Sequence, residues 1–222
     1  MANVLVVAAH PDDEALGCGG TMAKHANHGD RVRVLFLTDG EAARGPETAD
    51  AGRRQAACNS AVALLGAEPP AYLDFPDNAM DRSPLIEIVK RIEAEIGAFI
   101  PDVVYTHHAH DLNIDHRITH EAVMTVYRPQ PARPCPTILA FEVMSSTEWR
   151  APTAATVFIP NWYEDISVFL VAKKAALMAY RDEMRPWPHS RSIEAVEHLA
   201  RWRGACVGVE AAEAFSLVRK RG

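Results

Sequence analysis

The sequence lacks the features that define several large classes of protein. It has four cysteines in 222 residues and no Cys-x-x-Cys pair, so neither a disulfide framework nor a thiolate metal site is expected. Its formal net charge of -6 at pH 7 argues against a general nucleic-acid binder, because such a protein needs a basic face. The first apolar run is far shorter than the roughly 20 residues of a membrane span, and no basic segment precedes it. We therefore expect a cytoplasmic protein with no nucleic-acid partner and no membrane span.

Two familiar active-site motifs are also missing. There is no Gly-x-Ser-x-Gly segment, which argues against the nucleophile elbow of a serine hydrolase. The "GCGG" of residues 17–20 does not have the Gly-x-Gly-x-x-Gly spacing, and no Gly-Lys-Ser/Thr follows it. These glycines predict close packing between a helix and a strand, with phosphate binding as the alternative.

Two kinds of segment follow one another along the chain: apolar runs without a polar residue at every second position, and segments with helical spacing of apolar residues. Predicted strands lie at 4–9, 32–38, 71–75, 103–106 and 137–144, and predicted helices at 14–28, 51–65, 83–99, 115–127, 166–181 and 192–206. The segment "AEAFSLVR" at 212–219 is either a last strand or a docking segment. Four successive strand-then-helix units predict a mostly parallel sheet with helices on both faces, an α/β Rossmann-like three-layer sandwich.

The apolar content and the length suit one domain over residues 1–222. Within it, we expect an α/β core at 1–143 that carries the functional site. Residues 144–222 then supply a substrate-covering loop and the C-terminal helices.

Polar residues follow each of the first four predicted strands. Because ligands of an open parallel sheet bind outside the carboxyl ends of its strands, these residues are expected at one rim. They are His10, Asp12 and Asp13 after the first strand, Asp39 and Glu41 after the second, Asp74 and Asp77 after the third, and "THHAHDLNIDH" after the fourth. That last segment holds four of the ten histidines, at positions 107, 108, 110 and 116. A solvated loop would more often use Ser, Asn, Lys or Gly.

Imidazole and carboxylate groups are the ligands of Zn²⁺ or of another divalent metal such as Fe²⁺. His10 and Asp13 are three residues apart at a strand-to-helix turn, and His116 begins the fourth helix at the same rim. Three protein ligands leave one coordination position open, as in catalytic zinc sites. Asp12 cannot easily bind the same ion beside Asp13, so it is the candidate general base. A polar pocket without metal is the alternative.

Two motifs carry a resemblance to a known family. "AHPDDE" at residues 9–14 and "DLNIDHR" at 111–117 resemble motifs of the LmbE-like or PIG-L family of zinc-dependent N-acetylglucosaminyl deacetylases. The segments "LTDGE", "LGCGG" and "AEAF" are similar to that family as well, so the resemblance extends over nearly the whole chain. It implies an LmbE-like fold, zinc ligands at His10, Asp13 and His116, and Asp12 as the base.

The chain departs from this family at Asn113, where several members have a histidine that is thought to stabilise the oxyanion or to protonate the leaving amine. An asparagine amide can donate a hydrogen bond to an oxyanion, but it cannot supply a proton. The resemblance therefore leaves two candidate acids, Asp12 acting as a proton shuttle and His110. Asp115 is expected to orient a neighbouring side chain.

We expect an enzyme that removes the N-acetyl group from an N-acetylglucosamine-type sugar or sugar conjugate. Its partner is then a small N-acetylated molecule, and a homo-oligomer is possible. Four residues are predicted to bind the substrate: Arg44, Glu14, Ser146 and Trp149. Glu14 could instead be a first-turn carboxylate that the helix dipole favours. The alternative functions are an amidase for another N-acyl amine, such as an aminosugar natural product or a thiol conjugate, and a metal-free nucleotide-binding module.

Overall fold

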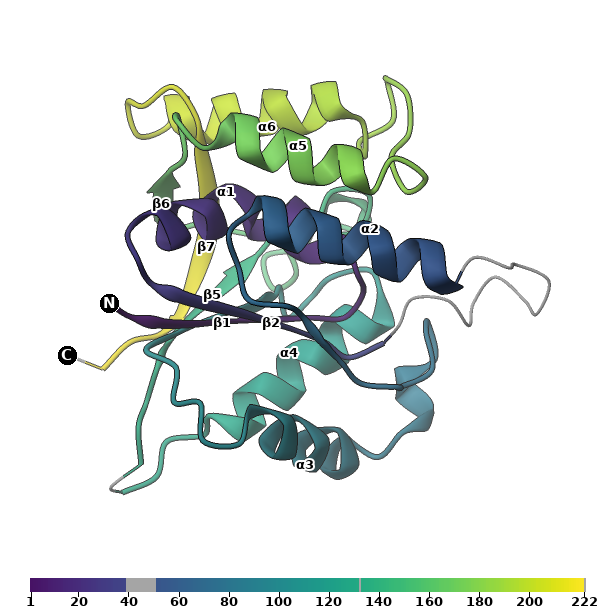
Figure 1. Ribbon diagram of the computed structural model, residues 1–222, viewed down its shortest axis with the longest axis vertical. Coiled ribbons are helices and arrows are strands. Elements are labelled where there is room, and N and C mark those ends of the chain that lie inside the picture. The colour runs from purple at the N-terminus through teal and green to yellow at the C-terminus, as the bar shows by residue number, and fades with distance from the viewer. Residues whose placement is uncertain (39–50, 132, 222) are drawn as a thin grey trace.

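The computed structural model describes residues 1–38, 51–131 and 133–221 (Figure 1). In this part of the chain, a seven-stranded sheet has the order β3-β2-β1-β4-β5-β7-β6. The strands are β1 (Asn3–Ala8), β2 (Arg31–Phe36), β3 (Ala71–Tyr72), β4 (Val103–His107), β5 (Thr137–Phe141), β6 (Trp162–Asp165) and β7 (Ala212–Arg219). The first five pair in parallel, whereas β7 runs antiparallel to both β5 and β6.

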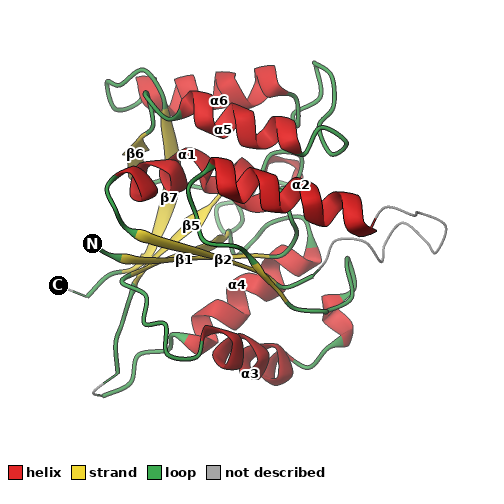
Figure 2. Cartoon of the chain, in the orientation of Figure 1, coloured by secondary structure: helices red, strands yellow, loops and turns green. Residues whose placement is uncertain are grey.

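Helices cover both faces of this sheet (Figure 2). The helices are α1 (Asp13–Asn27), α2 (Ala51–Leu64), α3 (Leu85–Ile96), α4 (Ile114–Val126), α5 (Leu170–Ala179) and α6 (Ile193–Ala205). Helices α1, α2, α5 and α6 lie on one side, and α3 and α4 lie on the other. The predicted Rossmann-like three-layer sandwich is therefore confirmed.

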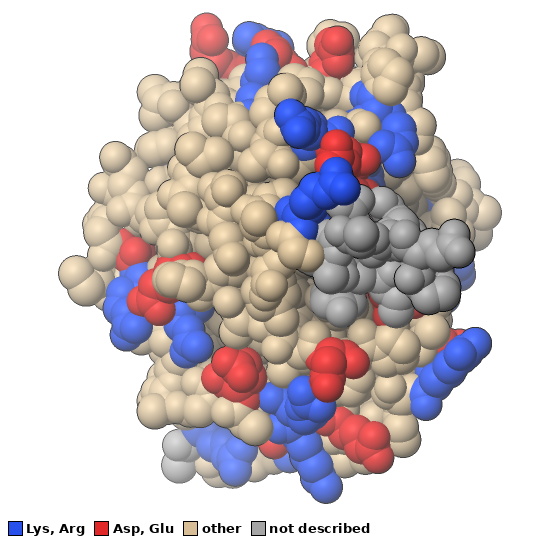
Figure 3. Space-filling view, turned by 45° about the vertical axis from the view of Figure 1, so that its right-hand side comes forward, with Lys and Arg blue, Asp and Glu red and all other residues tan. Residues whose placement is uncertain are grey.

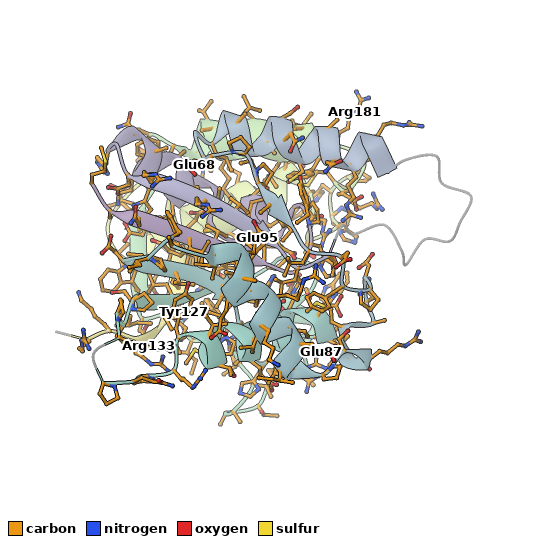
Figure 4. All side chains as sticks on the ribbon, turned by 60° about the horizontal axis from the view of Figure 1, so that its bottom comes forward. Glu68, Glu87, Glu95, Tyr127, Arg133 and Arg181 are labelled. Carbon is orange, nitrogen blue, oxygen red and sulfur yellow. The ribbon has the colours of Figure 1, made fainter. Side chains whose placement is uncertain are left out.

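Strand β1 shows why the predicted strands lack a polar face. Its Val4 and Val6 belong to the core under α1 and α2, while Leu5 and Val7 belong to the core over α3 and α4. Both faces of a central parallel strand are covered, so a polar side chain would be buried on either side. In contrast to β1, helix α3 is covered on one side only, and it carries Glu87 and Glu95 on its exposed side (Figure 4).

The glycines of "LGCGG" allow close packing of α1, as predicted. A Cβ atom at Gly17 would overlap the ring of Phe141, and one at Gly20 would lie 2.8 Å from the side chain of Ile166. Both glycines are buried. They therefore pack against the sheet and the C-terminal segment.

The C-terminal part differs most from the prediction. The segment "AEAFSLVR" is strand β7, inserted between β5 and the unpredicted strand β6. The predicted helix 166–181 begins only at Leu170, because turn residues precede it.

The predicted helix 83–99 is shorter as well: a 3-10 turn at Met80–Arg82 comes first, and α3 begins after Pro84. Proline lacks the N–H that a helix interior needs, so the boundary falls there.

Candidate active site

Three side chains converge at the carboxyl ends of β1 and β4. His10 and Asp13 follow β1, and His116 lies in the first turn of α4. His10 Nδ1 lies 3.2 Å from Asp13 Oδ2, and His116 Nε2 lies 3.3 Å from each of these two atoms. Donors on the corners of a tetrahedron, each about 2.1 Å from a zinc ion, are separated by about 3.4 Å. The three buried donor atoms therefore fit a single Zn²⁺ or similar ion.

A carboxylate oxygen lies within 3.1 Å of the outer nitrogen of each imidazole ring. His10 Nε2 lies 3.0 Å from Asp115 Oδ2 and 3.1 Å from Asp77 Oδ1. His116 Nδ1 lies 3.1 Å from Asp111 Oδ1. The hydrogen bond with Asp115 fixes the tautomer of His10, and both rings direct their other nitrogen toward the shared point. This arrangement is typical of histidines that bind metal ions.

The supporting carboxylates are themselves held by backbone and hydroxyl groups. Asp115 accepts the N–H groups of Asn78 at 2.6 Å and Met80 at 3.1 Å. Asp111 accepts the hydroxyl groups of Ser146 and Thr147. These hydrogen bonds connect the loops after β3, β4 and β5 next to the two histidines.

The pKa values reflect this crowding of buried charges. Burial alone would raise the pKa of Asp13, but the charges of His116 and His107 outweigh it and hold this pKa well below its usual range. Burial would lower the pKa of His116, but the neighbouring Asp13 and Asp111 raise it to about 9.

Five aspartates gather at this rim with side chains that are almost inaccessible to solvent. Their exposures are between 0% and 8%, for Asp12, Asp13, Asp77, Asp111 and Asp115. Burying so much negative charge is costly unless cations compensate it. A divalent cation at the His10–Asp13–His116 group would supply that compensation.

Asp12 lies beside this group with an unusual backbone. Its φ of 118° falls in the region that favours glycine, and its side chain is 2% exposed. Its N–H donates to Glu14 Oε2 at 3.0 Å, and its Oδ2 accepts a hydrogen bond from Arg191 Nη1 at 2.9 Å. Burial raises the pKa of Asp12 to about 6, although the charge of Arg191 opposes that rise.

A polar pocket of about 160 Å³ opens next to Asp12 and the two histidines. It is lined by His10, Asp12, Asp13, Arg54, Asp77, Asn78, Asn113, His116, Ser145, Ser146, Glu183 and Arg191. The lining contains both acidic and basic side chains. The face of the molecule in Figure 3 shows no broad area of one sign.

The other predicted catalytic residues occupy different places. Asn113 lines the pocket, but its Oδ1 accepts the N–H of Asp115 at 2.8 Å and its Nδ2 donates to Asn78 at 3.0 Å. It is thereby the N-cap of α4. His110 is exposed, contacts the ring of His108 and does not line the pocket.

The predicted substrate-binding residues are divided in the same way. Ser146 lines the pocket and donates its hydroxyl proton to Asp111. Glu14 is fully buried behind Asp12 and faces Tyr180, so it does not reach the pocket. Trp149 is 54% exposed and contacts the ring of His189 outside the pocket lining. Arg44 lies outside the described residues, as do Asp39 and Glu41.

Several residues at the site were not assigned a role from the sequence. Arg54 comes from α2, and Glu183 and Arg191 come from the connection between α5 and α6. No local motif marks them, because only the folded chain brings them to the rim. Asp111 and His107 do lie in the histidine-rich segment. The ring of His107 stacks on that of His116 with centroids 3.9 Å apart.

These features define a Rossmann-like α/β protein with a candidate metal site at the carboxyl edge of its sheet. Residues 5–127 match the family model described as PIG-L, GlcNAc-PI de-N-acetylase. The chain belongs to this family, as its two motifs predicted. Among the helices of the described ranges, none has the length and apolar character that a membrane span needs.

Known proteins similar to this chain include deacetylases. It is 30% identical over 197 residues to the 1D-myo-inositol 2-acetamido-2-deoxy-alpha-D-glucopyranoside deacetylase of Rhodococcus erythropolis, which covers 72% of this chain and 67% of the relative. It is 29% identical over 184 residues to the uncharacterized deacetylase YaiS of Escherichia coli, with 80% and 90% covered. The N,N'-diacetylchitobiose deacetylase of Pyrococcus horikoshii shares the fold, with a TM-score of 0.78, 22% identity, and 98% and 84% coverage.

Proposed function

We propose that this protein is a metal-dependent deacetylase that removes the N-acetyl group from an N-acetylglucosamine-type sugar or sugar conjugate. One observation carries the proposal. In a chain of the PIG-L family, three buried donor atoms lie 3.2 to 3.3 Å apart beside a carboxylate that faces a polar pocket. The relatives named as deacetylases support the N-acetyl group as the target.

His10, Asp13 and His116 would hold the metal, with Zn²⁺ as the first candidate and Fe²⁺ as the second. When bound there, the metal supplies Lewis-acid polarisation of an amide carbonyl and lowers the pKa of water. Asp77, Asp111 and Asp115 would keep both imidazole rings oriented toward it.

Asp12 would act as the general base. It lies in the pocket, and a pKa of about 6 leaves it mostly ionised at neutral pH while close enough to that pH for proton transfer. It takes a proton from water as the water attacks the acetyl carbonyl carbon. The C–N bond then breaks and the same proton passes to the leaving nitrogen, which yields acetate and a free amine.

The fixed side chain of Asn113 supports the shuttle role of Asp12. Its amide already bonds Asn78 and the start of α4, and it carries no acidic proton. His110 is exposed outside the pocket lining, so it is poorly placed to protonate a leaving amine there. Asn113 would instead donate its second N–H to a substrate oxygen, and Ser146 would accept a hydrogen bond from the substrate.

The experiment is an acetate-release assay over N-acetylated sugars and sugar conjugates with zinc-loaded protein. We expect acetate from at least one of them. The Asp12→Asn variant should keep its bound metal, because Asp12 is not a ligand, and should lose at least about 99% of turnover, because the general base is gone. Metal content is measured by atomic absorption on the same samples.

Two results would contradict parts of this proposal. Normal turnover by Asp12→Asn would require another base. Release of a different acyl group from a non-sugar amine, with no acetate from any sugar, would favour the amidase alternative.

A further inference from the structure

Arg191 comes from the C-terminal part of the chain and contacts the candidate base, Asp12, near the N-terminus. Its Nη1 donates to Asp12 Oδ2 at 2.9 Å across 179 positions of the sequence. Asp12 is 2% exposed and the Arg191 side chain 20%, so water screens this ion pair only weakly. Its Nε donates to Ser145 Oγ at 2.8 Å. The guanidinium group of Arg191 is therefore hydrogen-bonded to two residues of the pocket lining, Asp12 and Ser145.

Both partners of Arg191 have strained backbones. The φ angle is 118° at Asp12 and 66° at Ser145, and neither residue is glycine. Such conformations are unfavourable for a residue with a Cβ atom and persist only where the surroundings hold them. Glu14 accepts the backbone N–H of Asp12. Among the described residues, only Arg191 donates a hydrogen bond to the carboxylate of Asp12.

The backbone of Arg191 is fixed in turn. Its N–H donates to His189 Nδ1 at 3.0 Å, and its carbonyl accepts the N–H of Arg185 at 3.1 Å. The ring of His189 packs against Trp149. The guanidinium group is thus presented by an ordered turn before α6.

We propose that Arg191 is the positioning residue for the base: it holds the carboxylate of Asp12, whose backbone is strained, in the orientation that faces the pocket. This inference rests on the proposed function for its kinetic consequence, but the positioning itself can be tested without turnover. The competing role is direct contact with substrate. The guanidinium has three further N–H groups without a hydrogen-bond partner in the described part of the chain, so the test must separate the two roles.

The first test is hydrogen exchange of metal-free Arg191→Gln, followed by mass spectrometry of the peptide that covers residues 9–16. We expect exchange in this peptide to be about tenfold faster than in the wild type, because the strained turn loses its restraint. Arg185→Gln is the matched control, since Arg185 is exposed and, among the described residues, its side chain bonds only the carbonyls of Asp182 and Met184. Unchanged exchange in Arg191→Gln would overturn the proposal.

The second test is steady-state kinetics on the substrate found in the acetate-release assay. For Arg191→Gln we expect kcat to fall about 100-fold with KM within about twofold of the wild type, because a misplaced base slows chemistry more than binding. Arg191→Lys should recover part of kcat, since an ammonium can still pair with Asp12 but cannot also bond Ser145.

The two tests separate failure of this inference from failure of the proposed function. A raised KM with normal kcat would make Arg191 a substrate contact and overturn its positioning role. If the wild type releases no acetate from any sugar, the proposed function fails, while the exchange comparison still decides whether Arg191 positions Asp12. If Arg191→Gln does not fold, Arg191→Lys is taken through both measurements, and wild-type values in both would overturn the inference.

Discussion

Glu14 follows the two aspartates of the motif and is completely inaccessible to solvent. Its Oε2 accepts the N–H of Asp12 at 3.0 Å, and its Oε1 accepts the hydroxyl of Tyr180 at 2.7 Å. Burial raises the pKa of Glu14 from its ordinary value of 4.5 to about 8, although both hydrogen bonds oppose that rise. The residue therefore supports the backbone at the base, and it lies outside the pocket lining.

This burial predicts a pH-dependent stability. Between pH 4.5 and about 8 the folded protein keeps a proton on Glu14 that the unfolded chain releases, so its contribution to stability is lost as the pH rises. The loss is on the order of 4 kcal/mol over that range. Glu14→Gln stays neutral, so its Tm relative to the wild type should rise steadily from pH 5 to pH 8 in metal-free protein.

The matched control for this measurement is Glu95→Gln, an exposed carboxylate on α3 (Figure 4). Its Tm difference from the wild type should not vary with pH. If the difference for Glu14→Gln were equally flat, the folded and unfolded pKa values of Glu14 would have to be the same.

Helix α1 is broken in the middle, and the buried ion pair of Lys173 and Glu213 contacts both of its halves. Cys18 has φ of -145° and ψ of 23°, which is not helical. The carbonyl of Leu16 accepts Lys173 Nζ at 2.7 Å, and Glu213 accepts the N–H groups of Gly20 and Thr21 at 3.0 and 2.7 Å. Glu213 is the acidic residue of "AEAF", so this motif supports the helix that carries Asp13.

Removing the cation of this pair should destabilise the whole fold. Lys173 and Glu213 are each 4% exposed, so Lys173→Met leaves a buried carboxylate without its cation and should cost about 3–5 kcal/mol. Lys174→Met is the control, because Lys174 pairs with Glu197 at the surface and such a pair contributes about 1 kcal/mol or less. Urea unfolding measures both. Equal midpoints for the two variants would contradict this role.

On the scale of the whole molecule, the site connects segments that are distant in sequence. His10, Asp77, Asp111 and His116 follow three different strands, and Arg191 comes from the C-terminal part. Negative charge dominates the buried part of this assembly, and the chain as a whole has a net charge of -6. A cation that binds the folded protein and not the unfolded chain must therefore stabilise the entire structure.

Metal removal should reveal this linkage. With Zn²⁺ at 100 times its Kd, the free energy of unfolding should exceed that of chelator-treated protein by about 2.7 kcal/mol. His116→Ala should lose the bound metal, this stabilisation and the amidase activity together, whereas the exposed His198→Ala should keep all three. Calorimetry with and without zinc measures the difference. A His116→Ala variant that retained metal and activity would contradict the ligand assignment.

Short-range patterns were enough to predict most of the sheet and the centre of the site. Buried strands such as β1 read as unbroken apolar runs because both of their faces are covered. The three-residue spacing of His10 and Asp13 crosses one turn, so their convergence follows from local geometry. His116 needed one further assumption, that the carboxyl ends of parallel strands share a rim, and the structure brings its Nε2 within 3.3 Å of both.

The sequence by itself thus determined the α/β class, the family and the three candidate ligands, because each depends on residues near in sequence or on the regular order of a parallel sheet. Only the tertiary structure decided the surroundings of the base. Arg191 meets Asp12 across 179 positions, and the meeting depends on how β7 and α6 return to the sheet, which no local pattern encodes. It also changed the expected role of Glu14, since burial behind Asp12 is a property of the packed core.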